Sequence, residues 1–134
     1  MKKCIESALN INYHNKDIIL LNDGSEDISV FKEFSDKIKI FTQLNKKLPS
    51  TLNNLFCISK NYDFVSWGSS DNIWDKKFIN IHLKYHLQED IDITYSNYYV
   101  IDENGNYLHN KSYRPNNISK VNTSLVLVDD INEK

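Results

Sequence analysis

Two of the four histidines in this chain, His82 and His86, stand four residues apart in the segment FINIHLKYHL, residues 78–87. On a helix, this spacing places both imidazoles on one face, where they can bind one metal ion. On a strand that rises about 3.3 Å per residue, the two lie about 13 Å apart, too far for ligand bonds of about 2 Å. The chemistry therefore depends on the element that carries them.

The apolar residues of this segment favour a strand. Five of them alternate with polar residues: Ile79, Ile81, Leu83, Tyr85 and Leu87. Such a period of two is typical of a strand with one buried face. We therefore predict a strand with both histidines on its solvated face and no metal site, and we expect changing both to glutamine to leave the fold nearly intact. The alternative is a helix, in which the pair could bind a metal.

The histidines also allow an enzymatic alternative. A metal-independent hydrolase or nuclease needs a general base, a general acid and a cation. The residues that could supply them are His14, His82, Lys84, His86 and His109. A net charge of −2 argues against a role in binding nucleic acid, because contacts to phosphate require a basic surface.

Aromatic and acidic residues gather in two other segments, DFVSWGSSDNIWD at 63–75 and YSNYYVIDENGNY at 95–107. Interfaces are enriched in Trp and Tyr, and acidic rims attract basic partners. This pattern favours a partner-binding surface, with acidic residues that steer and aromatic residues that anchor. Its candidates are Asp63, Trp67, Asp71, Asp75, Tyr98, Tyr99, Asp102 and Glu103. The alternative is that Trp67 and Trp74 are core residues and the acids lie in solvated turns.

Apolar periodicity predicts the elements that must position these residues. Helices are expected over residues 2–10, 25–47 and 50–58, the second from an apolar stripe at steps of three and four. Strands are expected over residues 17–21, 62–67, 78–87, 91–101 and 123–128, with a tight turn at Asn104–Gly105. Helices lead and strands follow. The predicted class is therefore α+β, with N-terminal helices packed on a mainly antiparallel C-terminal sheet.

Length and composition bound the rest. A chain of 134 residues predicts a single domain, 1–134, with a charged tail at about 129–134. No segment resembles a signal peptide or a membrane span, so we expect a cytoplasmic protein. With two cysteines, three glycines and no phosphate-binding loop, the sequence predicts no cofactor. Its oligomeric state is open.

The chain resembles the immunity proteins of bacterial polymorphic-toxin systems, including those of contact-dependent growth inhibition. Like them, it is small and mildly acidic and shows no recognisable set of catalytic residues. The segment KLPSTLNNLF, residues 47–56, is similar to the Leu-Pro helix start of the SUKH immunity superfamily. This resemblance implies a binding protein, not an enzyme, that neutralises a cognate toxin by occluding its active site. The partner it implies is a basic nuclease domain. Phage-encoded inhibitors of bacterial defence share these features and are an alternative.

Overall fold

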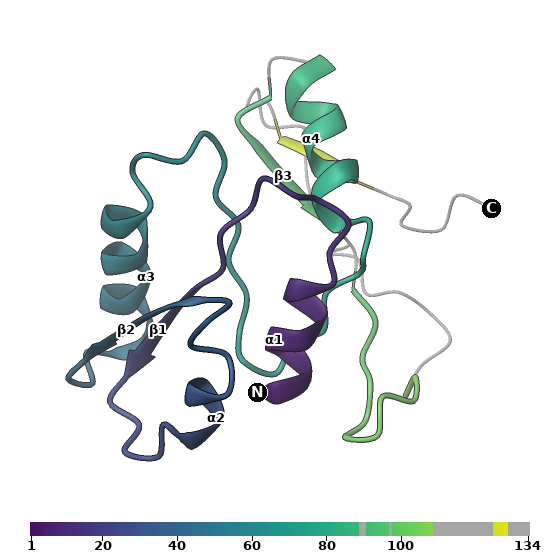
Figure 1. The fold of residues 1–134 in the computed structure, drawn as a ribbon. Helices are drawn as coiled ribbons and strands as arrows, with labels where there is room; N and C mark the ends of the chain where they lie inside the picture. Colours follow the sequence, from purple (N-terminus) through teal and green to yellow (C-terminus); the bar gives the residue numbers. More distant parts are fainter. Residues whose placement is uncertain (89–90, 97, 109–124, 129–134) are drawn as a thin grey trace. The chain divides into compact units, whose positions relative to one another are not determined.

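The computed structural model describes residues 1–88, 91–96, 98–108 and 125–128, and the chain divides into two compact units (Figure 1). The first unit, Met1–Trp74, contains α1 (Lys2–Leu9), β1 (Ile19–Asp23), α2 (Ser29–Lys32), β2 (Lys39–Gln43) and α3 (Lys47–Ile58). The second unit, Asp75–Lys134, contains α4 (Phe78–Gln88), β3 (Ile93–Ser96) and β4 (Leu125–Val128). The named strands form two separate two-stranded sheets.

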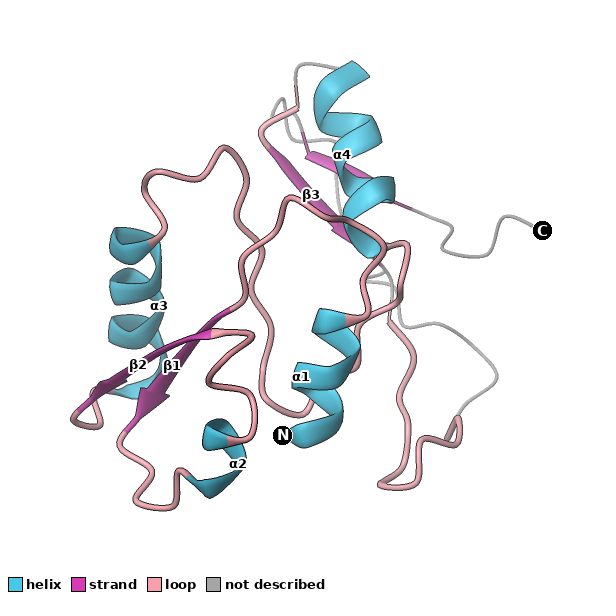
Figure 2. Ribbon diagram, in the orientation of Figure 1, coloured by secondary structure: helices cyan, strands magenta, loops and turns pink. Residues whose placement is uncertain are grey.

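The sheet of the first unit is parallel. β1 and β2 pair from Ile19 opposite Lys39 to Asp23 opposite Gln43. Parallel strands need a crossover connection, and α2 with its flanking turns provides it, after which α3 packs against β1 (Figure 2). Because both strands run in the same direction, their carboxyl ends meet at one edge of the sheet.

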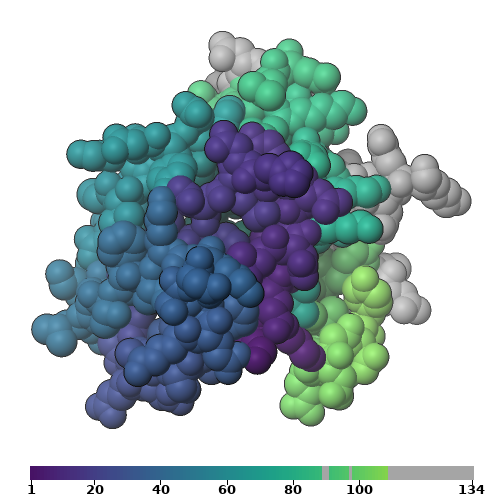
Figure 3. All heavy atoms as spheres, in the orientation of Figure 1, coloured from purple at the N-terminus to yellow at the C-terminus, as the bar shows by residue number. Residues whose placement is uncertain are grey.

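A small apolar core joins α1 to this sheet. Ile5, Phe34 and Ile38 are buried in it, and Leu20 and Ile40, which are partners in the strand register, pack against them. Burying side chains of this size contributes about 1.5–3 kcal/mol each. This burial holds the short helix α1, whose outer face lies at the surface (purple in Figure 3).

The helix predicted over residues 25–47 was wrong, since this segment contains α2, several turns and the strand β2. The predicted stripe did find buried residues, namely Phe31, Phe34 and Ile38. The backbone N–H groups of Phe34 and Lys37 bond to carbonyls three residues earlier. The turns therefore keep a helix-like period without a continuous helix, and pairing with β1 makes the rest a strand.

The strand predicted over residues 78–87 was also wrong, and the helical alternative is correct. The Asp75 carboxylate accepts a backbone N–H just before α4, as N-terminal capping residues do. Phe78, Ile81 and Tyr85 are half-buried along the helix. This segment therefore forms the helix that a spacing of three to four apolar residues indicates, although the period-two alternation of its apolar residues is the more regular pattern.

The strands of the second unit also pair in parallel, from Ile93 opposite Leu125 to Ser96 opposite Val128, and α4 packs on both. We had expected mainly antiparallel pairing, which the described residues show only at the bridge between Ile101 and Tyr107. Gly105 has a positive φ of 91° in the turn beside that bridge, as predicted, whereas Asn104, which was expected to share this conformation, has no positive φ.

Several other predictions can be compared with the structure. The helices predicted over residues 2–10 and 50–58 are confirmed as α1 and α3, and β1 and β4 confirm the first and last strands. Residues 62–67 form no strand. The α+β class and the single domain remain predictions, and the tail at 129–134 lies outside the described residues.

Candidate functional site

His82 and His86 lie one turn apart on α4 and share a partner on β3. Thr94 Oγ1 is 2.6 Å from His82 Nδ1 and 3.0 Å from His86 Nε2. The other ring nitrogen of His86, Nδ1, is 2.6 Å from the carbonyl oxygen of Ile91. The histidines therefore connect α4 to β3 and to Ile91, which lies two residues before β3. They do not lie on a solvated strand face. We now expect their double replacement by glutamine to weaken the fold.

One of these bonds has a fixed direction. A carbonyl oxygen only accepts, so His86 donates through Nδ1–H to Ile91. The Thr94 oxygen lies between His82 Nδ1 and His86 Nε2, and the direction of these two bonds follows the tautomers of the rings. His82 Nε2 is buried and has no hydrogen-bond partner among the described residues. Burial, with a smaller effect of His86, lowers the pKa of His82 to about 4.

This cluster is structural in character. Three of its four ring nitrogens already bond to Thr94 or Ile91. Within the described ranges, no group of three His, Cys, Asp or Glu side chains could hold a metal ion. The five residues of the hydrolase alternative do not fall in one described unit either, because His14 belongs to the first unit and His109 lies outside the described residues.

The predicted partner-binding residues are divided between the two units. Asp63, Trp67 and Asp71 belong to the first unit, and the other five belong to the second. Trp67 is 49% exposed, whereas Trp74 is half-buried. The eight residues therefore form no single surface within either unit.

Some of these residues stabilise local structure. Asp102 Oδ1 accepts the backbone N–H groups of Asn104 and Asn106 at 2.9 and 2.8 Å. The side-chain bond from Asn106 and these backbone bonds lower the pKa of Asp102. The rings of Tyr99 and Tyr107 pack edge to face, with centroids 5.1 Å apart. Asp102 therefore stabilises the turn that contains Asn104, and the packing of Tyr99 on Tyr107 holds together the segments on either side of this turn.

A different polar cluster lies at the carboxyl ends of β1 and β2. We call it the strand-end site, and it consists of Asn22, Asp23, Gly24, Gln43 and Lys46. Asp23 Oδ1 accepts two hydrogen bonds, at 2.7 Å from Gln43 Nε2 and at 2.8 Å from the backbone N–H of Lys46. The bond from Gln43, followed by that from Lys46, lowers the pKa of Asp23. This half-buried carboxylate is therefore held ionised at the edge of the sheet.

The turn that follows β1 is closed by Asn22, which is only 4% exposed. Its side chain accepts the N–H of Ser25 and donates to the carbonyl of Ser25, both at 2.9 Å. Gly24 has a φ of 93°, and a Cβ at this position would lie 2.9 Å from the backbone nitrogen of Asn45. Glycine is required here because the chain beyond β2 approaches so closely.

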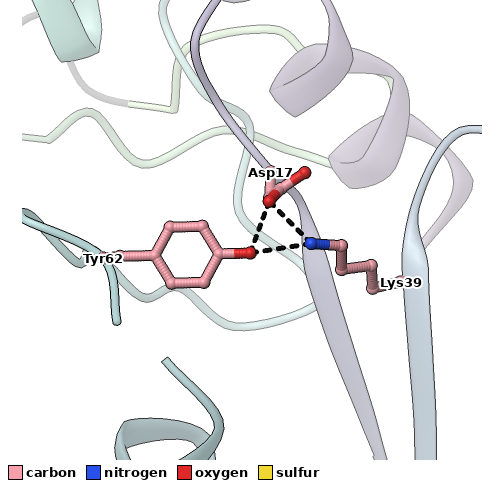
Figure 4. Close-up of polar contacts among 3 residues, drawn as sticks. All are labelled: Asp17, Lys39 and Tyr62. Carbon is pink, nitrogen blue, oxygen red and sulfur yellow. Dashed lines mark hydrogen bonds and ion pairs between the residues drawn. The ribbon is translucent and has the colours of Figure 1, made fainter. Parts of the chain in front are cut away.

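The amino ends of the same strands carry another set of contacts, drawn in Figure 4. Lys39 Nζ donates to Asp17 Oδ2 at 2.7 Å and to the Tyr62 hydroxyl oxygen at 2.9 Å. The Tyr62 hydroxyl donates to the same Asp17 oxygen. The bond to Asp17, followed by that to Tyr62, raises the pKa of Lys39 to about 12, and the same contacts lower the pKa of Asp17. Asp17 and Lys39 are exposed and Tyr62 is half-buried, and their contacts tie the segment after α3 to the sheet.

Sequence reasoning missed the strand-end site. The sequence of the segment NDGS, residues 22–25, predicts a turn after a buried strand, and its aspartate was considered only as a candidate N-terminal cap of the helix predicted over residues 25–47. The signal was available, because polar residues that directly follow a buried parallel strand lie where ligands bind in such sheets. Gln43 gave no such signal, since it lay inside the helix that we predicted.

Comparison with known proteins yields two similarities. The family described as glycosyl transferase family 2 matches residues 1–130. A protein of Rickettsia bellii (strain RML369-C) named "Uncharacterized glycosyltransferase" is 32% identical over 107 residues. The aligned region is 78% of this chain and 16% of that relative, so the chain spans about a sixth of the relative's length.

Proposed function

Since the chain belongs to glycosyl transferase family 2, we propose that it is part of an enzyme that transfers a sugar from an activated donor to an acceptor. We place the donor at the strand-end site. The observation that carries this placement is the parallel register, which brings Asp23 and Gln43 to one edge of the sheet. In open sheets of this kind, ligands bind beyond the carboxyl ends of the strands.

The charges of the strand-end site suit such a donor. Sugars present hydroxyl groups, which donate hydrogen bonds to an ionised carboxylate such as that of Asp23. The backbone N–H of Lys46 bonds to this carboxylate, and the first turn of α3, which begins at Lys47, adds partial positive charge close to it in the chain. This combination fits a neutral sugar joined to an anionic leaving group.

The family membership corrects several expectations from the sequence. The chain was expected to be a non-enzymatic immunity protein that occludes a basic toxin domain, and both the matched family and the Rickettsia relative are glycosyltransferases. The toxin partner and the phage inhibitor are therefore abandoned, and we propose a sugar donor and an acceptor in their place. The eight surface residues remain untested as binding residues for either. The cytoplasmic location remains a prediction. Among the described residues, no helix has the length and apolarity needed to cross a bilayer.

A comparison of two asparagine variants tests the proposal. Asp23→Asn removes the charge at the carboxyl end of β1, and Asp17→Asn removes a similarly bonded charge just before its amino end. With a panel of nucleoside diphosphate sugars as donors, we expect Asp23→Asn to lower kcat/KM at least tenfold and Asp17→Asn to change it less than twofold.

The possible failures differ from one another. Equal losses in both variants would assign the effect to the fold and not to the donor site. Full activity in Asp23→Asn would place the donor elsewhere. An unmodified protein that transfers no sugar from any donor in the panel would overturn the proposed function itself.

A further inference from the structure

Gln43 is held by three hydrogen bonds that fix the orientation of its amide. Its Nε2 donates to Asp23 Oδ1 at 2.7 Å and to Thr51 Oγ1 at 3.1 Å, and its Oε1 accepts from Asn54 Nδ2 at 2.5 Å. Both acceptors lie on the nitrogen side and the donor lies on the oxygen side. Reversing the amide would place its oxygen against the Asp23 carboxylate, so only one orientation is stable.

The two partners of Gln43 on α3 are themselves fixed. Thr51 is 8% exposed, and its hydroxyl donates to the Lys47 carbonyl at 3.0 Å, which leaves its oxygen to accept from Gln43. Asn54 lies three residues further along the same helix and is half-buried. The helix therefore holds Gln43 from behind, at the position directly opposite Asp23 in the strand register.

We propose that Gln43 is a positioning residue that sets the direction of the Asp23 carboxylate toward the sugar donor. This inference rests on the proposed function. The amide of Gln43 and the backbone N–H of Lys46 both bond to Oδ1, so the rotation of the carboxylate is fixed and the direction of Oδ2 is fixed with it. Asp23 contacts the donor, and Gln43 acts through Asp23.

Two substitutions of nearly the same size separate this role from simple packing. Gln43→Met keeps the length of the side chain and removes all three hydrogen bonds. Gln43→Glu keeps the acceptor for Asn54 but places a carboxylate against Asp23. Protonation at low pH restores one O–H donor to that carboxylate, so lowering the pH should rescue Gln43→Glu and not Gln43→Met.

The experiment measures donor KM, kcat and their pH dependence for both variants, with Gln88→Glu as the control because it makes the same change at an exposed residue at the end of α4. We expect donor KM to rise about tenfold in Gln43→Met and Gln43→Glu at pH 7.5, with kcat changed less than threefold. We also expect the KM of Gln43→Glu to fall back toward the unmodified value between pH 7.5 and 5.

Titration of the Asp23 carboxyl carbon by NMR gives a second readout that does not need activity. Gln43→Met should raise the pKa of Asp23, because the first of the bonds that lower it is lost. An unchanged donor KM in an active protein, or an unchanged Asp23 titration, would overturn the positioning role. A raised Asp23 pKa in a protein that transfers no sugar would instead retain the contact and reject the proposed function.

Discussion

Acid should destabilise the second unit through His82. The folded-state pKa of His82 is about 4, against an ordinary value of 6.5, because burial disfavours the charged ring and His86 adds a smaller effect. Between these values, the unfolded chain binds a proton that the folded chain does not. The free energy of unfolding therefore falls as the pH drops below about 6.5, and the loss levels off below about 4.

The magnitude follows from the size of this difference. Each pH unit between the two pKa values is worth about 1.36 kcal/mol, and pH 5 lies about 1.5 pH units below the ordinary value. The full loss at pH 5 is therefore about 2 kcal/mol. Because the ring keeps some contact with solvent, we expect a measured loss of about 1–2 kcal/mol relative to pH 7.

The assay must report on the second unit itself. Both tryptophans, Trp67 and Trp74, lie in the first unit, so their fluorescence is unsuitable. Hydrogen exchange of the α4 amides in a urea series, at pH 7 and at pH 5, measures the unfolding free energy of the helix that carries His82. His82→Gln is the matched variant, since the other histidines are present in both proteins and their effects cancel in the difference.

Between pH 7 and pH 5, we expect the free energy of unfolding to fall by about 1–2 kcal/mol less in His82→Gln than in the unmodified protein. NMR titration of the His82 ring should independently give a midpoint near 4. Equal losses in the two proteins, or a midpoint near 6.5, would show that the ring is hydrated and that the Thr94 contact does not bury it.

Two further predictions concern backbone conformation. Gly24→Ala should lower the free energy of unfolding in urea by about 2 kcal/mol or more, because a φ of 93° is combined with a distance of 2.9 Å from the added Cβ to the Asn45 backbone. Gly105→Ala should lower it clearly less, because its φ is also positive, at 91°, but nothing lies within 4 Å of the added Cβ. Equal losses in the two variants would refute the contact argument. Lys47→Gly should raise the free energy of unfolding by about 0.5–1 kcal/mol, because Lys47 has a φ of 68° that glycine adopts without strain. Lys46→Gly is the control and should lower the free energy of unfolding, because φ is −119° there. A lower free energy of unfolding in both variants would show that Lys47 is not strained.

The elements that could be predicted are those whose signal is local. In α1, β1 and α3, a helical apolar face, a short apolar run or a proline at the helix start lies within about ten residues of sequence. The segment 25–47 shows the limit of such signals. Phe31, Phe34 and Ile38 are buried as predicted, but their period is kept by turns. Whether residues 39–43 form a helix or a strand depends on β1, which lies 20 residues earlier.

The same limit explains why the histidines were misassigned. In FINIHLKYHL the period-two pattern places Ile79 and Leu83 in the core together with Ile81 and Tyr85, and each of these side chains is in fact half-buried. A helix packed on β3 and β4 can bury much of its circumference, and its apolar residues then satisfy both periods. The helix also brings both rings to Thr94, a contact that joins residues 12 and 8 apart in the sequence.

The strand-end site was missed for a further physical reason. Counting Trp, Tyr and acidic residues directs attention to segments such as 63–75, where all but Trp74 are exposed and where composition alone states no geometry. A carboxylate that is positioned for chemistry is defined instead by what holds it. Asp23 is held by Gln43 from β2 and by the backbone of Lys46, and Gln43 is held by Thr51 and Asn54 from α3. These residues come from three segments that only the parallel register and the packing of α3 bring together, so a sequence shows one of them at most: the aspartate at the end of a buried strand, followed by a glycine.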